Sequence, residues 1–462
     1  MLMTYHLLCP DNAKEELINQ ANEWKGDMRI LIATAGSHGD VLPFIALGKE
    51  LSRRGYEIYF YANPVFAEHV ADAGLRFHPV STAQAYASLF REAVDDNSRQ
   101  AFKRIAQEFE TLNGEYYTAM KADLIPGKTV VLGGSLLFAP RLLSETGAIP
   151  CVTVHLAPSI VRSDYHPARL DARWITGSTP AIIRKIAWWL LDRFYESSVT
   201  APLNKLRAEL GLVPLKRIFQ SWIHEADSVI CLFPAWFANP QDDWPRQLVL
   251  SGFPLYDREN TQALSSEVLR FIEAGSPPVG ISAGTATANS HDFFQTSIAA
   301  CKTAGLRAIL LSPFTEHIPE KLPEGILHVP YAPFESLLPR LAAFIHHGGI
   351  GSTSQALRAG IPQLIRPVAY DQFDNSARAM ELGVGRELLA KQYKTQNVAK
   401  VLAILTGDPA IKRRCEEVSK HFGKNDGIAM AADSIEKTLL HRKTHGVFDR
   451  RADAPVATER MS

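Results

Sequence analysis

Residues 344–385 constrain the fold of this chain more than any other stretch of its sequence. An apolar run that ends at Ile345 predicts a buried strand, and two histidines and the sequence GGIGST follow it directly. Glycine-rich sequence between a strand and a helix predicts a tight turn, and the first turn of the following helix has backbone N–H groups without partners. We therefore expect an anion-binding site at the start of this helix, which should stop at Gly360 because glycine readily adopts the left-handed conformation of a helix end.

A second strand is expected at Gln363–Arg366, and an acid and an amide, Asp371 and Gln372, follow shortly after it. The carboxyl ends of parallel strands lie at one edge of a sheet, so these two side chains should lie beside the anion site. A carboxylate and an amide are suited to sugar hydroxyls, since both accept hydrogen bonds. This edge therefore predicts a site for a diphosphate with an attached sugar.

The whole pattern, HHGGxGS, GxPQ and DQFDN in that order, resembles the nucleotide-sugar signature of family 1 glycosyltransferases, the inverting enzymes of the GT-B fold. The resemblance implies that a nucleotide sugar is the donor substrate and that no other cofactor is needed. By position, it assigns diphosphate binding to His347, Gly349, Gly351 and Ser352. It assigns binding of the sugar hydroxyls to Asp371 and Gln372.

Three further donor contacts follow from the same resemblance. Tyr331, in the sequence YAPF, falls at the position that stacks on the nucleotide base, and Thr285, in AGT, falls in a loop near the donor phosphates. Gln355 stands where many members have a glutamate for the ribose hydroxyls, so ribose binding departs from the family pattern. Ser352 is also expected to cap its helix. The chain has no D-x-D triplet, so we expect the donor to be bound without a metal ion.

The first buried strand is expected at Met28–Ala33, and the sequence TAGSHGDVLP follows it. This turn resembles the GSxGDVxP turn of microbial members of the family, which places Asp40 at the position of the general base. His38 is the alternative base, since related plant enzymes use a histidine there. A third interpretation is that Asp40 only caps the next helix, which is expected to have Pro43 in its first turn and to end before Gly55.

The length of 462 residues predicts two domains. Short expected strands alternate with helical runs in both halves, which is typical of an α/β protein with doubly wound parallel sheets. The resemblance implies the GT-B arrangement, in which two Rossmann-like domains face a central cleft. The expected divisions are an N-terminal extension that is not native or is disordered (1–27), an acceptor-binding domain (28–255), a linker (256–265), a nucleotide-sugar-binding domain (266–442) and a disordered tail (443–462).

The composition narrows the class of protein further. Lys and Arg together number 49, as do Asp and Glu, so no overall charge favours nucleic acid. The five cysteines include no CxxC pair, which indicates a reducing compartment and argues against a disulfide framework or a zinc site. No apolar run reaches membrane-spanning length, and the first residues do not resemble a secretory signal. We therefore expect a cytoplasmic protein.

The stretch Lys216–Asp257 indicates the acceptor. Its strings KRIF, CLFPAWFA, DWP and GFPL resemble the rhamnosyltransferases of the family that make rhamnolipids. This implies transfer of L-rhamnose from dTDP-L-rhamnose to the hydroxyl of a 3-(3-hydroxyalkanoyloxy)alkanoate lipid, which a partner enzyme would synthesise. Ser135 and His155 follow expected strand ends and would line the acceptor pocket. The aromatic run Trp188–Tyr195 would wall an acyl pocket or make a peripheral contact with the inner membrane, although most such runs are simply core.

Other functions stay open at this point. The donor is alternatively UDP-glucose, and the acceptor a sterol, polyketide or phenol. A nucleotide-sugar epimerase would share the phosphate site without needing an apolar acceptor wall. A non-catalytic nucleotide-sugar-binding partner would keep His347 and the glycines but would not need Asp40.

Overall fold

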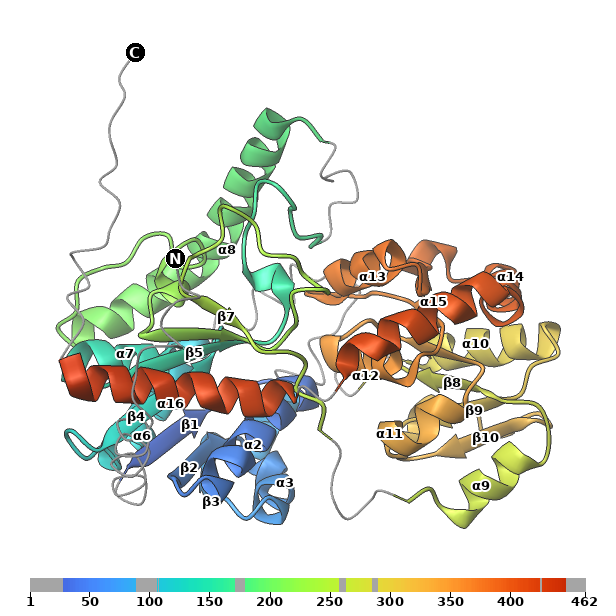
Figure 1. Cartoon of the computed structure of the whole chain (residues 1–462), viewed down its shortest axis with the longest axis horizontal. Helices are drawn as coiled ribbons and strands as arrows, with labels where there is room; N and C mark the ends of the chain where they lie inside the picture. The colour runs from blue at the N-terminus through green and yellow to red at the C-terminus, as the bar shows by residue number, and fades with distance from the viewer. Residues whose placement is uncertain are drawn as a thin grey trace, which may run out of the picture.

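The computed structural model of the protein describes residues 28–88, 106, 108–170, 179–256, 263–284, 290–423 and 426–445. The expected extension at 1–27, residues 257–262 of the expected linker, Thr285 and the tail beyond residue 445 lie outside these ranges. Two lobes are built around two parallel sheets, one of seven strands and one of six (Figure 1). The prediction of two Rossmann-like parallel-sheet domains is therefore confirmed.

The first sheet has the strand order β3-β2-β1-β4-β5-β6-β7. Its strands are β1 Arg29–Ala33, β2 Glu57–Ala62, β3 Arg76–Pro79, β4 Thr129–Gly134, β5 Cys151–His155, β6 Ser228–Cys231 and β7 Leu248–Leu250. Its helices are α2 His38–Arg53, α3 Ala67–Asp72, α4 Ala83–Tyr86, α6 Phe109–Ala122, α7 Ala139–Gly147 and α8 Ala181–Glu209. The order in which strands are added to the sheet reverses between β1 and β4. Ligands of such sheets bind at the carboxyl ends of the two strands on either side of that point.

The alternating side chains of β1 explain how this lobe is layered. Ile30 and Ile32 pack in one apolar cluster with α2 and α3. Leu31 and Ala33 point to the opposite face and pack with α6, α7 and α8. Because a strand in such a sheet is buried on both faces, its sequence is a continuous apolar run, which is why β1 was predictable.

The second sheet has the order β10-β9-β8-β11-β12-β13. Its strands are β8 Val279–Ser282, β9 Ala308–Leu311, β10 Ile326–Val329, β11 Ala343–His346, β12 Gln363–Ile365 and β13 Gly385–Glu387. Its helices are α9 Ser266–Glu273, α10 His291–Thr303, α11 Phe334–Leu337, α12 Ile350–Ala359, α13 Gln372–Glu381, α14 Thr395–Gly407 and α15 Pro409–Ser419. The reversal of strand order falls between β8 and β11, so the turns after these two strands lie at the predicted position for a ligand.

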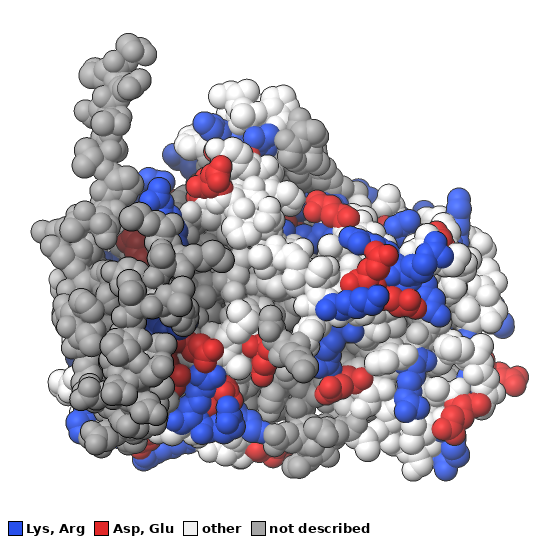
Figure 2. Space-filling model, in the orientation of Figure 1, with Lys and Arg blue, Asp and Glu red and all other residues white. Residues whose placement is uncertain are grey.

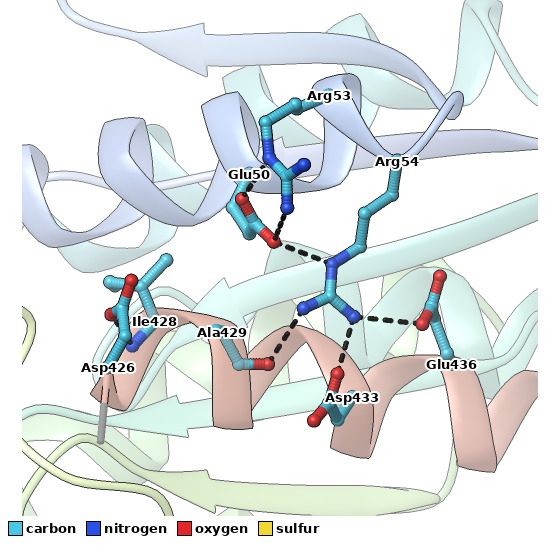
Figure 3. Close-up of polar contacts among 8 residues, drawn as sticks. All are labelled: Glu50, Arg53, Arg54, Asp426, Ile428, Ala429, Asp433 and Glu436. Carbon is cyan, nitrogen blue, oxygen red and sulfur yellow. Dashed lines mark hydrogen bonds and ion pairs between the residues drawn. The ribbon is translucent and has the colours of Figure 1, made fainter. Parts of the chain in front are cut away.

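Helix α16, Gly427–His445, returns from the second lobe to the first and packs against α2 (Figure 1). Its apolar side chains join the core of the first sheet, and the buried ones are Ile428, Ala431, Ala432, Ile435 and Leu439. Arg54, at the end of α2, donates to Asp433 Oδ1 at 2.6 Å, to Glu436 Oε2 at 2.9 Å and to the carbonyl of Ala429 at 3.1 Å (Figure 3). The end of the chain that leaves the second lobe is therefore held on the first lobe.

Two local predictions were wrong. Helix α2 begins at His38, so Pro43 lies in its second turn rather than its first. The helix starts earlier because Asp40 Oδ2 accepts hydrogen bonds from the backbone N–H of Ser37 at 2.7 Å and from its Oγ at 2.9 Å, which caps the first turn. The three-residue strands β7 and β13 were not predicted.

No helix in the described part of the chain is long and apolar enough to cross a membrane.

Candidate active site

The turn between β11 and α12 forms an open helix N-terminus. Gly349 is the N-cap residue, so the prediction that Ser352 caps the helix was wrong. Glycine has no side chain to bond the first turn, and within the described residues the backbone N–H groups of Gly351 and Ser352 remain free. Gly351 is exposed and Ser352 half-buried. The free N–H groups and the positive end of the helix dipole form a site for an anion such as a phosphate.

The ring of His347 lies between the backbones of Gly284 and Gly349. A Cβ atom on Gly284 would lie 2.6 Å from His347 Cε1, and one on Gly349 would lie 2.5 Å from Nε2, so both positions need glycine. Burial lowers the pKa of His347 to about 4, and its ring is therefore neutral at pH 7. Nδ1 is buried without a hydrogen-bond partner in the described part of the chain. We call this ring and the open start of α12 the cradle. A ligand bound in the cradle would supply the missing partner for Nδ1.

The neighbouring His346 has a structural role instead. Its Nδ1 accepts the backbone N–H of Gly348 at 3.0 Å, and its Nε2 bonds Gln363 Oε1 at 2.9 Å. Burial lowers the pKa of His346 to about 3, so the ring stays neutral and holds the turn to β12. Gly348 has a φ of +93°, and a Cβ there would lie 2.7 Å from Ile365 Cγ2.

Asp371 is tied to the same turn. Asn375 donates through Nδ2 to Asp371 Oδ2 at 2.7 Å and to the carbonyl of Gly348 at 3.0 Å, while the backbone N–H of Ile350 also bonds the carboxylate. The predicted sugar-binding acid is thus held beside the open helix end. Asn375 belongs to the DQFDN string but was missed as a site residue, because its role depends on a turn 27 residues away.

The charge of Asp40 in the first lobe acts on Asp371 in the second. Burial raises the pKa of Asp371 to about 7, and the negative charge of Asp40 is a further cause of the rise. Burial also raises the pKa of Asp40, against the two hydrogen bonds from Ser37 that favour its charged form. The carboxylate predicted to act as base therefore lies near the predicted sugar-binding acid. Gly36, with a φ of +133°, permits this geometry, since a Cβ there would lie 2.4 Å from Asp40 Oδ2.

The alternative base, His38, points to a different neighbourhood. Its ring makes edge contacts with Phe66 and His69, at centroid distances of 5.1 and 5.3 Å. Asp40 caps α2, and its charge also acts on Asp371 in the other lobe. The choice between Asp40 and His38 as the general base stays a prediction.

The remaining predicted donor contacts are distributed around the second lobe. The ring of Tyr331 is 53% exposed, as a stacking surface for a base must be. Gln372 Oε1 accepts the backbone N–H groups of Val368 at 2.8 Å and Ala369 at 3.1 Å, which leaves its amide N–H groups for a ligand. Gln355 is buried, and its Oε1 has no hydrogen-bond partner among the residues that the structure describes.

Three hydrogen-bonded side chains lie in a row where the central strands β4 and β5 of the first sheet end. Ser135 Oγ is 2.8 Å from His155 Nδ1, and His155 Nε2 is 2.9 Å from His224 Nδ1. His224 also donates a ring N–H to the carbonyl of Phe219, so its Nδ1 accepts from His155 and His155 accepts from Ser135. Burial lowers the pKa of His224 to about 4 and that of His155 well below its usual value, so both rings stay neutral. Ser135 follows β4, the strand beside β1, and its position suits an acceptor-side contact.

The two lobes also meet beside α13. Arg169 of the first lobe donates its backbone N–H to Asp374 Oδ1 at 3.0 Å and bonds Glu387 Oε1 through Nη2 at 2.8 Å. Arg378 of the second lobe donates to the carbonyl of Phe237 at 3.2 Å. These contacts are buried or partly buried, so they help to fix the orientation that brings Asp40 opposite Asp371.

No three His, Cys, Asp or Glu side chains within the described ranges are grouped so that they would hold a metal ion. Metal-independent donor binding stays a prediction.

Two family models match the chain. Residues 30–165 match the glycosyltransferase family 28 N-terminal domain, and residues 311–425 match the erythromycin biosynthesis protein CIII-like C-terminal domain. The first match includes the turn of Asp40, and the second includes the cradle and Asp371. The matched regions thus include both Asp40 and Asp371.

Whole-chain comparisons agree with these matches. The chain is 28% identical over 431 residues to the O-mycaminosyltylonolide 6-deoxyallosyltransferase of Streptomyces fradiae, covering 90% of this chain and 99% of that one. The solved structure of the kitacinnamycin glycosyltransferase matches with a TM-score of 0.69 at 17% identity, over 89% of this chain and 98% of that one. Glycosyltransferase GtfE of Amycolatopsis orientalis is 30% identical over 428 residues, 88% of this chain and 97% of the relative. The chain therefore belongs to the family 1 glycosyltransferases of the GT-B fold, enzymes that transfer a sugar from a nucleotide sugar to an acceptor.

Proposed function

We propose that this glycosyltransferase transfers L-rhamnose from dTDP-L-rhamnose to the hydroxyl of a 3-(3-hydroxyalkanoyloxy)alkanoate and so makes a glycolipid biosurfactant. The observation that carries the catalytic part is that Asp40 lies close enough to Asp371, beside the open N-terminus of α12, for its charge to raise the pKa of Asp371. The strings KRIF, CLFPAWFA, DWP and GFPL between Lys216 and Asp257 support the lipid acceptor. The reaction would take place in the cytoplasm, where an acceptor-synthesising enzyme would supply the lipid.

In the proposed reaction, the acceptor hydroxyl attacks the anomeric carbon as Asp40 takes its proton. The new carbon–oxygen bond forms while the bond to the nucleoside diphosphate breaks, and Asp40 later returns the proton to water. Negative charge on the departing diphosphate is stabilised by the N–H groups of Gly351 and Ser352 and by the ring of His347. Because base and leaving group lie on opposite lobes, displacement is in line and the anomeric configuration inverts. No metal ion is needed in this scheme.

Gln355 supports a deoxyribonucleotide donor. Its buried Oε1 has no partner in the described part of the chain, and an unpaired buried acceptor is costly, so a ligand hydroxyl at this position would be favourable. A carboxylate has two oxygens to accept both hydroxyls of a ribose, whereas one amide oxygen suits the single free hydroxyl of a deoxyribose. Tyr331 would stack on the thymine, and the hydroxyl of Thr285 would donate a hydrogen bond to the phosphates.

Other substrates remain as alternatives within the same chemistry. UDP-glucose would use the same cradle, and Asp371 and Gln372 would bind the hydroxyls of either sugar. A polyketide acceptor is favoured by the similarity to the 6-deoxyallosyltransferase, whose name gives a tylonolide acceptor. An epimerase or a non-catalytic partner would not require a base opposite the sugar site.

The deciding experiment combines a donor panel with a lipid assay. The protein is incubated with dTDP-L-rhamnose or UDP-glucose, with and without the hydroxyalkanoyloxyalkanoate, and with and without EDTA. Acceptor-dependent release of dTDP, unaffected by EDTA, supports the proposal. Mass spectrometry of the product then separates a deoxyhexose adduct from a hexose adduct. Donor isomerisation without acceptor indicates an epimerase, binding without turnover indicates a non-catalytic partner, and transfer only to a sterol, polyketide or phenol contradicts the lipid acceptor.

A further inference from the structure

The first turns of α8 carry an apolar face that points outward. Five large side chains are exposed within nine residues, namely Ile182 (65%), Ile183 (40%), Ile186 (52%), Trp189 (58%) and Leu190 (56%). Their spacing of i, i+1, i+4, i+7 and i+8 places them on one side of the helix. This end of α8 projects from the first lobe (Figure 1). An apolar face of this kind on a projecting helix indicates a surface that meets a partner. We call these five residues the α8 face.

The α8 face is not needed to hold the helix in place. On the other side of the helix, Ala187 is buried and the guanidinium of Arg162 lies 5.0 Å from the ring centre of Trp188. Farther along, Val199 and Leu203 are buried in the core of the lobe. The second half of α8 therefore anchors the helix, while the first half presents its apolar side to the surroundings.

Two exposed basic residues flank the α8 face. Lys185 lies one turn before Trp189 and Arg193 one turn after it, whereas Arg184 is on the opposite side of the helix and donates to the carbonyl of Thr179. Residues 181–191 include no acid. The next acid, Asp192, is paired with Arg162, and Arg193 lies 5.4 Å from the ring centre of Trp189. Figure 2 shows Lys and Arg side chains on this projecting end beside uncharged surface. The partner should therefore combine an apolar interior with a negatively charged outer layer.

We propose that the α8 face docks on an anionic phospholipid bilayer. Isoleucine and leucine side chains would enter the acyl boundary, Trp189 would lie at the level of the headgroups, and Lys185 and Arg193 would reach lipid phosphates. Binding would be weak and reversible, since one short helix face buries little area. The proposal extends the proposed function, because a membrane-bound enzyme would meet a lipid acceptor where it concentrates, but bilayer binding does not depend on that function.

The test measures binding of the full chain to vesicles by flotation, without donor or acceptor. We expect binding to vesicles of phosphatidylethanolamine and phosphatidylglycerol, weaker binding at high salt, and at least tenfold weaker binding to phosphatidylcholine alone. Ile186→Glu with Leu190→Glu should weaken binding at least tenfold, and so should Lys185→Glu with Arg193→Glu. Val213→Glu is the matched control, since Val213 is 74% exposed outside the α8 face, and it should bind like the wild type. Circular dichroism and dTDP affinity check that each variant is folded.

Three outcomes would overturn the proposal. One is no binding to either vesicle, and another is equal loss of binding in the Val213→Glu control. The third is a concentration-dependent dimer in ultracentrifugation that the α8 variants abolish, which would assign the α8 face to a second copy of the chain. Vesicle binding with no glycolipid product would contradict the proposed function alone, so the two failures are distinguishable.

Discussion

The two lobes place the same local design at the site, a strand followed by a glycine turn and a helix, but the two turns leave different groups available. In the first lobe, Asp40 accepts two hydrogen bonds from Ser37 and caps α2. In the second lobe, the N-cap is Gly349, and among the described residues the N–H groups of Gly351 and Ser352 have no side-chain cap. The first turn therefore presents a carboxylate, and the second presents donors.

The difference explains how one architecture serves two chemical tasks. A base must hold a negative charge that is ready to take a proton, and the bonds from Ser37 favour that charged form. A site for a departing diphosphate needs unpaired donors, which a side-chain cap would consume. Replacing Asp40 would remove the base, and replacing Gly349 would obstruct the diphosphate site. The two turns can therefore be tested separately.

The largest effect is expected from the first turn. Asp40→Asn should lower kcat by about 10²–10⁴, because an amide cannot take the acceptor proton. The amide oxygen still accepts a hydrogen bond from Ser37, so the fold and dTDP affinity should persist. Steady-state kinetics and calorimetry with dTDP measure the two quantities. His38→Ala is the matched comparison and should be milder, and a larger loss in that variant would reassign the base.

Substitutions in the second turn should lower the affinity for dTDP rather than kcat. His347→Ala should weaken dTDP binding by roughly tenfold or more, since hydrogen bonds to charged groups contribute about 1.5–3 kcal/mol. Ser352→Ala should cause a smaller loss, since its backbone N–H remains. Gly349→Ala should also weaken binding, because the added Cβ would displace the His347 ring. Gly407→Ala is the control, as a Cβ at that position meets no atom within 4 Å. Unchanged dTDP affinity in the His347 and Gly349 variants would refute the cradle.

Asp371 distinguishes the sugar from the nucleotide. Asp371→Ala should spare dTDP affinity and weaken binding of the intact donor by about tenfold, because only the sugar contacts the carboxylate. In the wild type, donor affinity should fall as the pH drops through about 7, where Asp371 gains its proton. Asp40→Asn removes the nearby negative charge and should move this midpoint to lower pH. Calorimetry with dTDP and with a non-transferable donor across pH 5–8 measures both effects. If Asp371→Ala lost affinity equally for dTDP and for the intact donor, Asp371 would not be a sugar-binding residue.

Much of the fold was accessible from the sequence because buried parallel strands are continuous apolar runs. The strands expected at Met28–Ala33 and Gln363–Arg366 match β1 and β12 to within one residue. The strands β7 and β13 are only three residues long and have mixed burial, so their sequences carry no such signal. The start of α2 was misjudged because the preference of proline for a first turn was weighed above the capping pair Ser37 and Asp40.

The candidate site was predictable where a motif is local and not where it depends on distant partners. His347 and the glycines lie within one turn, so their spacing indicated the cradle. His224 and Asn375 act through residues 69 and 27 positions away, and no local pattern announces such pairs. The influence of Asp40 on Asp371 depends on how the lobes are oriented, which the contacts of Arg169 and Arg378 help to set.

The smallest expected effect concerns stability, and it distinguishes the two carboxylates once more. The pKa of Asp371 is raised in the folded protein, so folding favours its protonated form, and the carboxylate destabilises the empty protein as the pH rises from about 4 to 7. Asp371→Asn should therefore raise the Tm at pH 8 by roughly 2 °C, and this gain should shrink at pH 5. Asp40→Asn should give a smaller gain, because the bonds from Ser37 favour the charged form of Asp40. Differential scanning fluorimetry without ligand measures both variants, and a gain for Asp371→Asn that is independent of pH would mean that its charge is not the cause.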